Sequence, residues 1–200
     1  MYKKQMALQR ILCIVAIVAC ALVFVYALGY MTDVYDMVYS LRESYKTDEI
    51  KAFLSDMDLF NRSLVRVGIG LILVSLTLML TNTHVRRKYY IGNYCAVGLY
   101  TACTVAASVW AHQEIASFKA RYLSGIIDFE VVKSWAERSA RNGGVSVYTD
   151  STFWFDVHWF VFGLLVCVAI LLVLNTVWKV LLMKSEKETL AGATGKVVSA

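Results

Sequence analysis

Three ionisable residues stand at the ends of long apolar segments, where a charge could serve binding or transport. Arg66 lies one helical turn into one segment, and Asp156 and His158 begin another. A charge in apolar surroundings is costly, so such groups usually pair with one another or face a polar site. The pattern predicts a binding cluster of Arg66, Asp156 and His158, with an Arg66–Asp156 ion pair as its sharpest contact. The alternative is that Arg66 extends toward water while Asp156 stays hydrated.

Two histidines offer a second kind of chemistry. His112 and His158 lie at corresponding ends of two apolar segments, where facing imidazoles could supply the axial ligands of a haem. The alternative is that each is an amphipathic residue at a boundary between water and an apolar region. The third histidine, His84, lies in a connection at the opposite end of the segments and cannot join them.

The cysteines are too dispersed to predict a metal site or a disulfide framework. All five fall within apolar segments, at Cys13, Cys20, Cys95, Cys103 and Cys167. A structural zinc site needs about four ligands, often in closely spaced pairs, and a buried thiol packs as a small hydrophobe. The sequence also lacks the motifs HExxH, GxSxG, CxxC, GxGxxG and the P-loop. We therefore expect no metal, no cofactor and no catalytic residues, and thus a protein that is not an enzyme.

The segments that carry these residues are too long and too apolar for a soluble protein. Hydrophobic residues make up 58% of the 200 residues and charged residues only 18%, whereas soluble domains are about one quarter charged. Four apolar runs cover 11–30, 63–82, 90–111 and 157–183. About 20 apolar residues suffice for a helix to cross the roughly 30 Å hydrocarbon core of a bilayer. The sequence predicts an all-α integral membrane four-helix bundle, a single domain over 1–200.

Charge is distributed between the connections in a way that predicts orientation. The N-terminus, the turn after the second span and the region after the fourth hold ten cations: Lys3, Lys4, Arg10, Arg86, Arg87, Lys88, Lys179, Lys184, Lys187 and Lys196. The connections 31–62 and 112–156 are mildly acidic instead. Cytoplasmic connections are enriched in Lys and Arg, so both termini are expected in the cytoplasm, in a plasma or bacterial inner membrane. Arg86, Arg87 and Lys88 would then contact lipid head groups, and no basic soluble module suggests nucleic-acid binding.

The two longer connections contain helical patterns of their own. Residues 47–62 continue into the second span, and 112–126 extend the third. Helix boundaries are marked by capping residues, namely Thr47 or Asp48 before the second span, Asp128 and Gly143-Gly144 around a separate amphipathic helix, and Asp150 or Ser151 before the fourth span. We expect two helical extracytoplasmic segments, 31–62 and 112–156, and a short cytoplasmic tail over 184–200.

Small residues mark faces where helices can approach closely. Gly68 in the second span, and Gly98, Ala102 and Ala106 in the third, could pack against another helix of the bundle or of a partner. The amides of Asn93 and Asn175 are expected to bridge helices. A transport path would need polar groups through the middle of the spans, which are almost entirely apolar.

These patterns favour a non-enzymatic accessory or scaffolding subunit that binds another membrane protein or a second copy of itself. Two alternatives stay open at this point. One is a small transporter or channel that uses Arg66, Asp156 and His158 as an entry site. The other is a membrane redox subunit with haem between His112 and His158.

Overall fold

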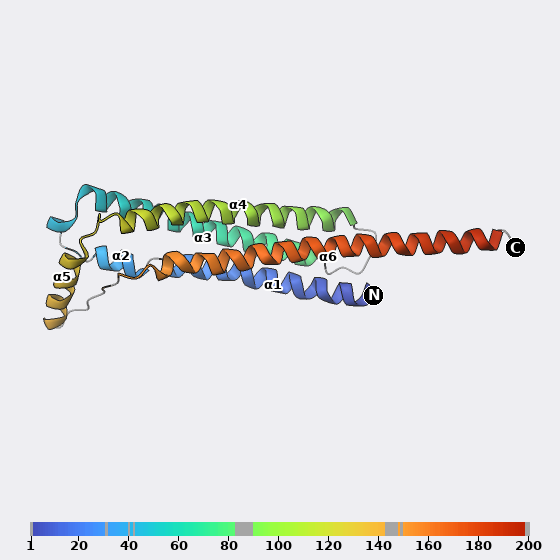
Figure 1. Cartoon of the computed structure of the whole chain (residues 1–200), viewed down its shortest axis with the longest axis horizontal. Coiled ribbons are helices and arrows are strands. Elements are labelled where there is room, and N and C mark those ends of the chain that lie inside the picture. Colours follow the sequence, from blue (N-terminus) through green and yellow to red (C-terminus); the bar gives the residue numbers. More distant parts are fainter. Residues whose placement is uncertain are drawn as a thin grey trace. The chain divides into compact units, whose positions relative to one another are not determined.

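The computed structural model describes residues 2–30, 32–39, 41, 43–82, 90–142, 148 and 150–198. Every regular element in this part of the chain is a helix (Figure 1). In chain order they are α1 (Tyr2–Gly29), α2 (Thr32–Tyr39), the short 3-10 helix η1 (Glu43–Tyr45), α3 (Asp48–Asn82), α4 (Tyr90–Leu123), α5 (Phe129–Arg141) and α6 (Phe153–Val198). The prediction of an all-helical fold is confirmed.

Four helices are long and apolar enough to cross a membrane. The candidate spans are Lys3–Tyr39, Asp48–Asn82, Ile91–Leu123 and Phe153–Thr189, and each overlaps one of the four apolar runs predicted from the sequence. With 35 residues at 1.5 Å each, α3 is about 52 Å long, well beyond the roughly 30 Å of a hydrocarbon core. The four helices are therefore long enough to cross a membrane and to continue past its apolar core.

The helix boundaries follow capping chemistry that the sequence predicted. Thr47 Oγ1 accepts a hydrogen bond from the Ile50 N–H (3.3 Å) at the start of α3. Asp128 accepts from the Glu130 and Val131 N–H groups (3.1 and 3.2 Å) and so caps α5. At the start of α6, Ser151 Oγ accepts from the Phe153 N–H (3.1 Å). Each cap satisfies a backbone donor that has no partner within its helix.

The ends of α5 and α6 differ from the predicted boundaries or cannot be compared with them. Gly143-Gly144 lies outside the described residues, and the C-cap of α5 is Asn142. Beyond the expected fourth span, α6 continues as one helix to Val198, so the predicted tail is largely helical.

Contacts between Cα atoms divide the chain into two compact units that share the four long helices. Unit 1 comprises Met1–Cys20, Leu71–Val105 and Leu164–Ala200, and unit 2 comprises Ala21–Gly70 and Ala106–Gly163. Unit 2 thus contains α2, η1 and α5 together with segments of α1, α3, α4 and α6.

Amide side chains connect the helices within unit 1. Gln9 of α1 donates to Asn82 Oδ1 of α3 (3.2 Å), and Asn175 of α6 donates to Gln9 Oε1. With its carboxamide nitrogen toward α3, Asn93 of α4 donates to the Thr81 carbonyl (2.5 Å) and accepts from Lys179 Nζ of α6 (3.0 Å). The predicted bridging role of Asn93 and Asn175 is confirmed, and Gln9 joins them.

Aromatic rings fill the interior of unit 2. Tyr30, which follows α1, lies edge-on to Phe60 of α3 with ring centroids 5.6 Å apart, and Phe60 contacts Phe118 of α4 (5.4 Å). Phe155 of α6 contacts both Tyr30 (6.4 Å) and Tyr122 of α4 (5.2 Å). Such ring pairs stabilise by about 0.5–1.5 kcal/mol each beyond the apolar area they bury.

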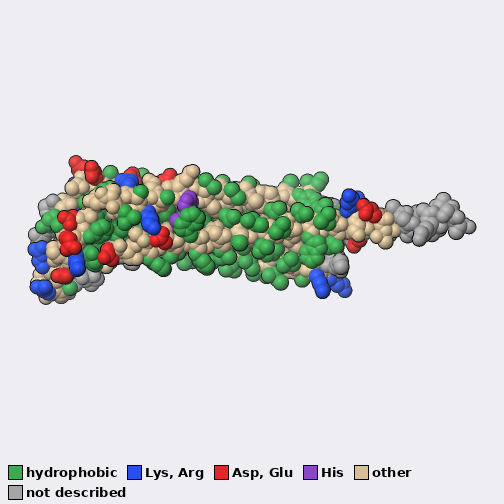
Figure 2. Space-filling model, viewed as in Figure 1, with side chains coloured by type: hydrophobic (Ala, Val, Ile, Leu, Met, Phe, Trp, Pro, Cys, Tyr) green, Lys and Arg blue, Asp and Glu red, His purple; other side chains and the backbone are tan. Residues whose placement is uncertain are grey.

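Many large apolar side chains remain on the surface of the long helices. Figure 2 shows them along these helices, while the charged side chains are concentrated toward the ends of the helices. Leu80, Ile91 and Phe160 are 68%, 79% and 70% exposed. Soluble proteins rarely leave such extensive apolar surface uncovered, so lipid is the natural solvent for it.

Candidate functional site

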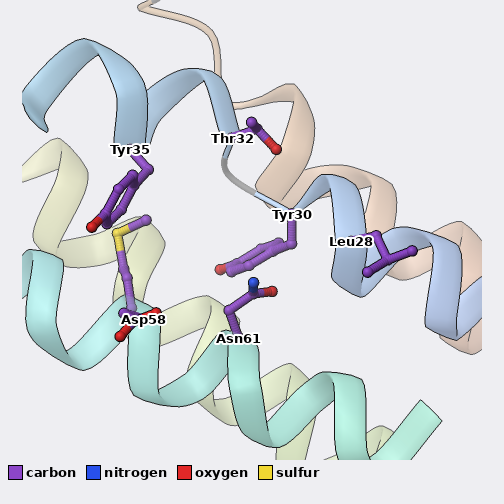
Figure 3. A pocket seen from close by; sticks show the side chains of 7 residues that line it. Leu28, Tyr30, Thr32, Tyr35, Asp58 and Asn61 are labelled. Carbon is purple, nitrogen blue, oxygen red and sulfur yellow. The ribbon is translucent and has the colours of Figure 1, made fainter. Parts of the chain in front are cut away.

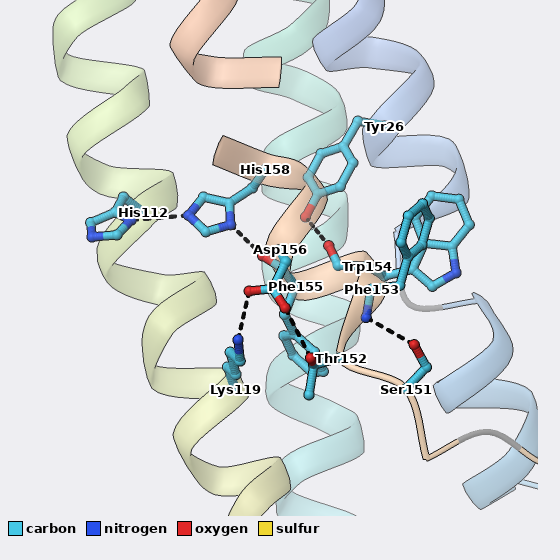
Figure 4. A network of polar contacts seen from close by, with 10 residues as sticks. All are labelled: Tyr26, His112, Lys119, Ser151, Thr152, Phe153, Trp154, Phe155, Asp156 and His158. Carbon is cyan, nitrogen blue, oxygen red and sulfur yellow. Dashed lines mark hydrogen bonds and ion pairs between the residues drawn. The ribbon is translucent and has the colours of Figure 1, made fainter. Parts of the chain in front are cut away.

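A pair of histidines in unit 2 joins α4 to α6 (Figure 4). His112 Nδ1 lies 3.0 Å from His158 Nε2, and the two rings stack with centroids 5.3 Å apart. Trp159 adds a ring 4.4 Å from that of His112. His158 is only 4% exposed, so its hydrogen bonds have to be made within the protein.

The partners of His158 determine where the protons lie in the neutral pair. His158 Nδ1 contacts the Phe155 carbonyl oxygen, which can only accept, so Nδ1 carries the hydrogen. In a neutral ring, Nε2 is then an acceptor, and the His112 Nδ1–H donates to it. His112 is left with Nε2 as an unprotonated nitrogen.

Asp156 forms an ion pair on the same two helices. Lys119 Nζ of α4 lies 2.5 Å from Asp156 Oδ1, and Thr152 Oγ1 donates to Oδ2 (2.9 Å). Lys119 and Asp156 are 33% and 49% exposed, so the pair is partly hydrated and contributes about 0–1 kcal/mol.

The predicted cluster of Arg66, Asp156 and His158 is brought together only in part. Asp156 and His158 lie within one turn of α6, and Tyr26 fixes that turn by donating to the Trp154 carbonyl oxygen (2.8 Å). Arg66 is exposed on α3, and the ion pair of Asp156 is made with Lys119 instead. The reason is that α4 continues to Leu123, which brings Lys119 to the start of α6.

The spacing of Lys119 and His112 in the sequence indicates that they share a helix face. Lys119 lies seven residues after His112, which is two helical turns, so both side chains occupy one face of α4. Asp156 and His158 supply the matching pair on α6. The network therefore ties α4 to α6 at two levels about 10 Å apart along α4.

The geometry of the histidine pair does not fit a haem iron between the rings. Iron–nitrogen bonds resemble the roughly 2.0–2.1 Å of zinc–imidazole bonds, so two axial nitrogens stand about 4 Å apart. His112 Nδ1 and His158 Nε2 are 3.0 Å apart and share a hydrogen bond. Within the described ranges, no group of three or more His, Cys, Asp or Glu side chains gathers as a metal site would require.

Gly68 lies in close contact with a neighbouring helix, whereas the small residues of the third span do not. A Cβ added at Gly68 would lie 3.0 Å from Phe24 Cα, so this glycine permits close contact between α3 and α1 in unit 2. A Cβ at Gly98 would meet nothing within 4 Å. Ala102 and Ala106 follow Gly98 at intervals of four residues, and all three are exposed on α4.

The predicted head-group contacts of Arg86, Arg87 and Lys88 lie outside the described residues. The chain matches no protein-family model, no curated protein and no solved structure.

Proposed function

We propose that the protein is a non-enzymatic accessory or scaffolding subunit that binds another membrane protein. The observation that carries this proposal is the exposed face of α4 formed by Gly98, Ala102 and Ala106, called here the small-residue face. Helices in lipid gain no hydrophobic free energy by associating, so close backbone approach at small residues supplies much of the attraction.

The small-residue face is separate from the face that α4 uses within the protein. The internal face consists of residues that are nearly or fully buried, namely Ala96, Val97, Tyr100, Thr104, Ala107 and Ala111. Gly98 has no neighbour that would require a glycine. A helix with small residues at exposed positions has room for a second helix there. This supports a partner that contributes a membrane-spanning helix.

The proposal includes an orientation. In this orientation both termini lie in the cytoplasm, and α2, η1 and α5 lie on the other side of the membrane. This orientation is supported by the cations of the terminal segments and by the mildly acidic composition of 31–62 and 112–156. Under it, the acidic segments offer a second, water-exposed surface to the same partner.

Cross-linking and co-purification in a mild detergent, from native membranes, test this function. Replacing Ala102 or Ala106 by Leu should lower the yield of co-purified partner about tenfold or more, because a Leu side chain separates the helices. Cys167→Leu is the matched control: it enlarges an exposed small residue on α6 and should leave the yield unchanged. A wild-type protein that runs as a lone monomer and cross-links to nothing in its native membrane would remove the basis of the proposal.

A further inference from the structure

A cavity in unit 2 lies between the end of α1, α2 and α3 (Figure 3). Its volume is about 270 Å³, which is slightly below the range usual for drug-sized ligands and suits a small head group. The side chains around it combine apolar and polar groups, namely Leu28, Tyr30, Thr32, Tyr35, Met57, Asp58 and Asn61.

Two buried polar atoms at this cavity have no hydrogen-bond partner among the described residues. They are the hydroxyl oxygen of Tyr30 and Oδ1 of Asn61, and Tyr30 as a whole is only 4% exposed. Figure 3 shows the Tyr30 ring and the Asn61 carboxamide close to each other, one from the α1 side and one from α3. Buried polar groups in native proteins are nearly always paired, so a bound molecule is a natural source of the missing partners.

The charges at the cavity favour a neutral ligand. Asp58 is the acid of the lining, and Arg62 holds both of its oxygens, with Nε–Oδ1 at 3.1 Å and Nη2–Oδ2 at 2.8 Å. A cationic ligand that approached the Asp58 carboxylate would also approach the positively charged Arg62, which repels it. Thr32 also has a partner, since its hydroxyl donates to the Gly29 carbonyl (3.1 Å).

The two unpaired atoms have complementary needs. Asn61 Oδ1 can only accept a hydrogen bond, whereas a phenol can both donate and accept. A single hydroxyl group satisfies both, because it donates its proton to Asn61 Oδ1 and accepts from the Tyr30 hydroxyl. Leu28 lines the cavity, is 59% exposed and belongs to a candidate span. An apolar chain attached to that hydroxyl would therefore lie along a lipid-facing helix.

We propose that this cavity binds the hydroxyl group of a neutral amphiphile, an alcohol on an apolar body, with Tyr30 and Asn61 as its two hydrogen-bond partners. Such an alcohol could be a membrane lipid or a free fatty alcohol, and the hydrogen-bond chemistry is the same. The inference is independent of the partner proposed above.

Photolabelling in phosphatidylcholine nanodiscs tests the proposal. The probe is a long-chain primary alcohol that carries a diazirine, and cross-linked peptides are mapped by mass spectrometry. Label should appear on peptides containing Tyr35 or Met57. Unlabelled 1-decanol should compete about tenfold better than decyl methyl ether, which has no proton for Asn61. Competition by a sterol as strong as that by decanol would assign a lipid source, and competition by decanol alone would assign a free alcohol.

Substitutions separate this site from nonspecific partition into lipid. Tyr30→Phe and Asn61→Leu should each reduce specific labelling about five- to tenfold, whereas Tyr45→Phe, an exposed tyrosine of η1, should leave it unchanged. Tyr30→Phe should also keep or raise the midpoint of thermal unfolding, since the hydroxyl it removes has no partner. Equal competition by alcohol and ether, stronger competition by decylammonium, unchanged labelling in both variants, or a marked fall in the unfolding midpoint of Tyr30→Phe would each overturn the proposal.

Discussion

At the scale of single residues, two glycines with the same helical conformation have opposite surroundings. Gly68 faces the Phe24 backbone, where an added Cβ would lie 3.0 Å from Cα, and Gly98 faces open space. Sequence alone places both in spans and assigns both to helix packing. Only the arrangement of the helices distinguishes an internal contact from an exposed position.

Gly68→Ala should destabilise the protein by about 1–3 kcal/mol, because α1 and α3 have to separate to admit a methyl group. Gly98→Ala should not destabilise it, since alanine favours a helix by about 1 kcal/mol over glycine and meets no neighbour. Unfolding in bicelles by steric trapping measures both. Equal stability of the two variants would contradict the close α1–α3 contact.

The histidine pair makes a second prediction at this scale. His112→Ala leaves His158 Nε2 buried without its donor, which should cost about 1–3 kcal/mol. The double variant His112→Ala, His158→Ala should be less destabilised than the sum of the single variants, with a coupling of about 1 kcal/mol. Additive effects in the same unfolding assay would mean that the 3.0 Å contact contributes nothing.

At the scale of elements, the amides of unit 1 show which polar groups hold helices together. Gln9 links α1 to α3 and α6 through Asn82 and Asn175. Gln5 lies one turn earlier on α1 and is fully buried, yet neither its Oε1 nor its Nε2 has a hydrogen-bond partner among the described residues. The two glutamines therefore provide a natural comparison on one helix face.

Gln9→Leu should lower the free energy of unfolding by about 1–3 kcal/mol, because it leaves Asn82 Oδ1 and Asn175 Nδ2 without their partner. Gln5→Leu should be neutral or stabilising, since it removes two unpaired buried groups. Differential scanning calorimetry in detergent would show the ordering as a lower unfolding midpoint for Gln9→Leu alone. The reverse ordering would contradict the amide network.

The sequence predicts elements better than it predicts partners. The positions of the apolar runs, the caps at Thr47, Asp128 and Ser151, and the helical extension of the second and third spans all follow from local chemistry and are present. These features depend on neighbouring residues along the chain.

Contacts between helices depend on rotation and depth, which a single sequence leaves open. For this reason the sequence leaves open whether Asp156 pairs with Arg66 or stays hydrated, and it does not point to Lys119, which is the actual partner. Nor does the sequence indicate that Gln9 lies beside Asn175. The cavity at Tyr30 and Asn61 cannot be predicted from the sequence either, because its walls come from three elements whose packing no motif encodes.

At the scale of the whole molecule, the proposals depend on four helices long and apolar enough to span a membrane. They depend also on the net positive charge of the terminal segments and of the connection after the second span. The small-residue face needs lipid around α4, and the alcohol site needs Leu28 at a lipid-facing surface. Neither proposal would hold if the spans did not cross the bilayer in alternating directions.

Fusions of alkaline phosphatase and green fluorescent protein after residues 45, 87 and 198, expressed in a bacterial inner membrane, test this arrangement most directly. Phosphatase is active only outside the cytoplasm, and the fluorescent protein folds only inside it. We predict phosphatase activity after residue 45 and fluorescence after residues 87 and 198. Phosphatase activity after residue 87 together with fluorescence after residue 198 would contradict the four-span arrangement.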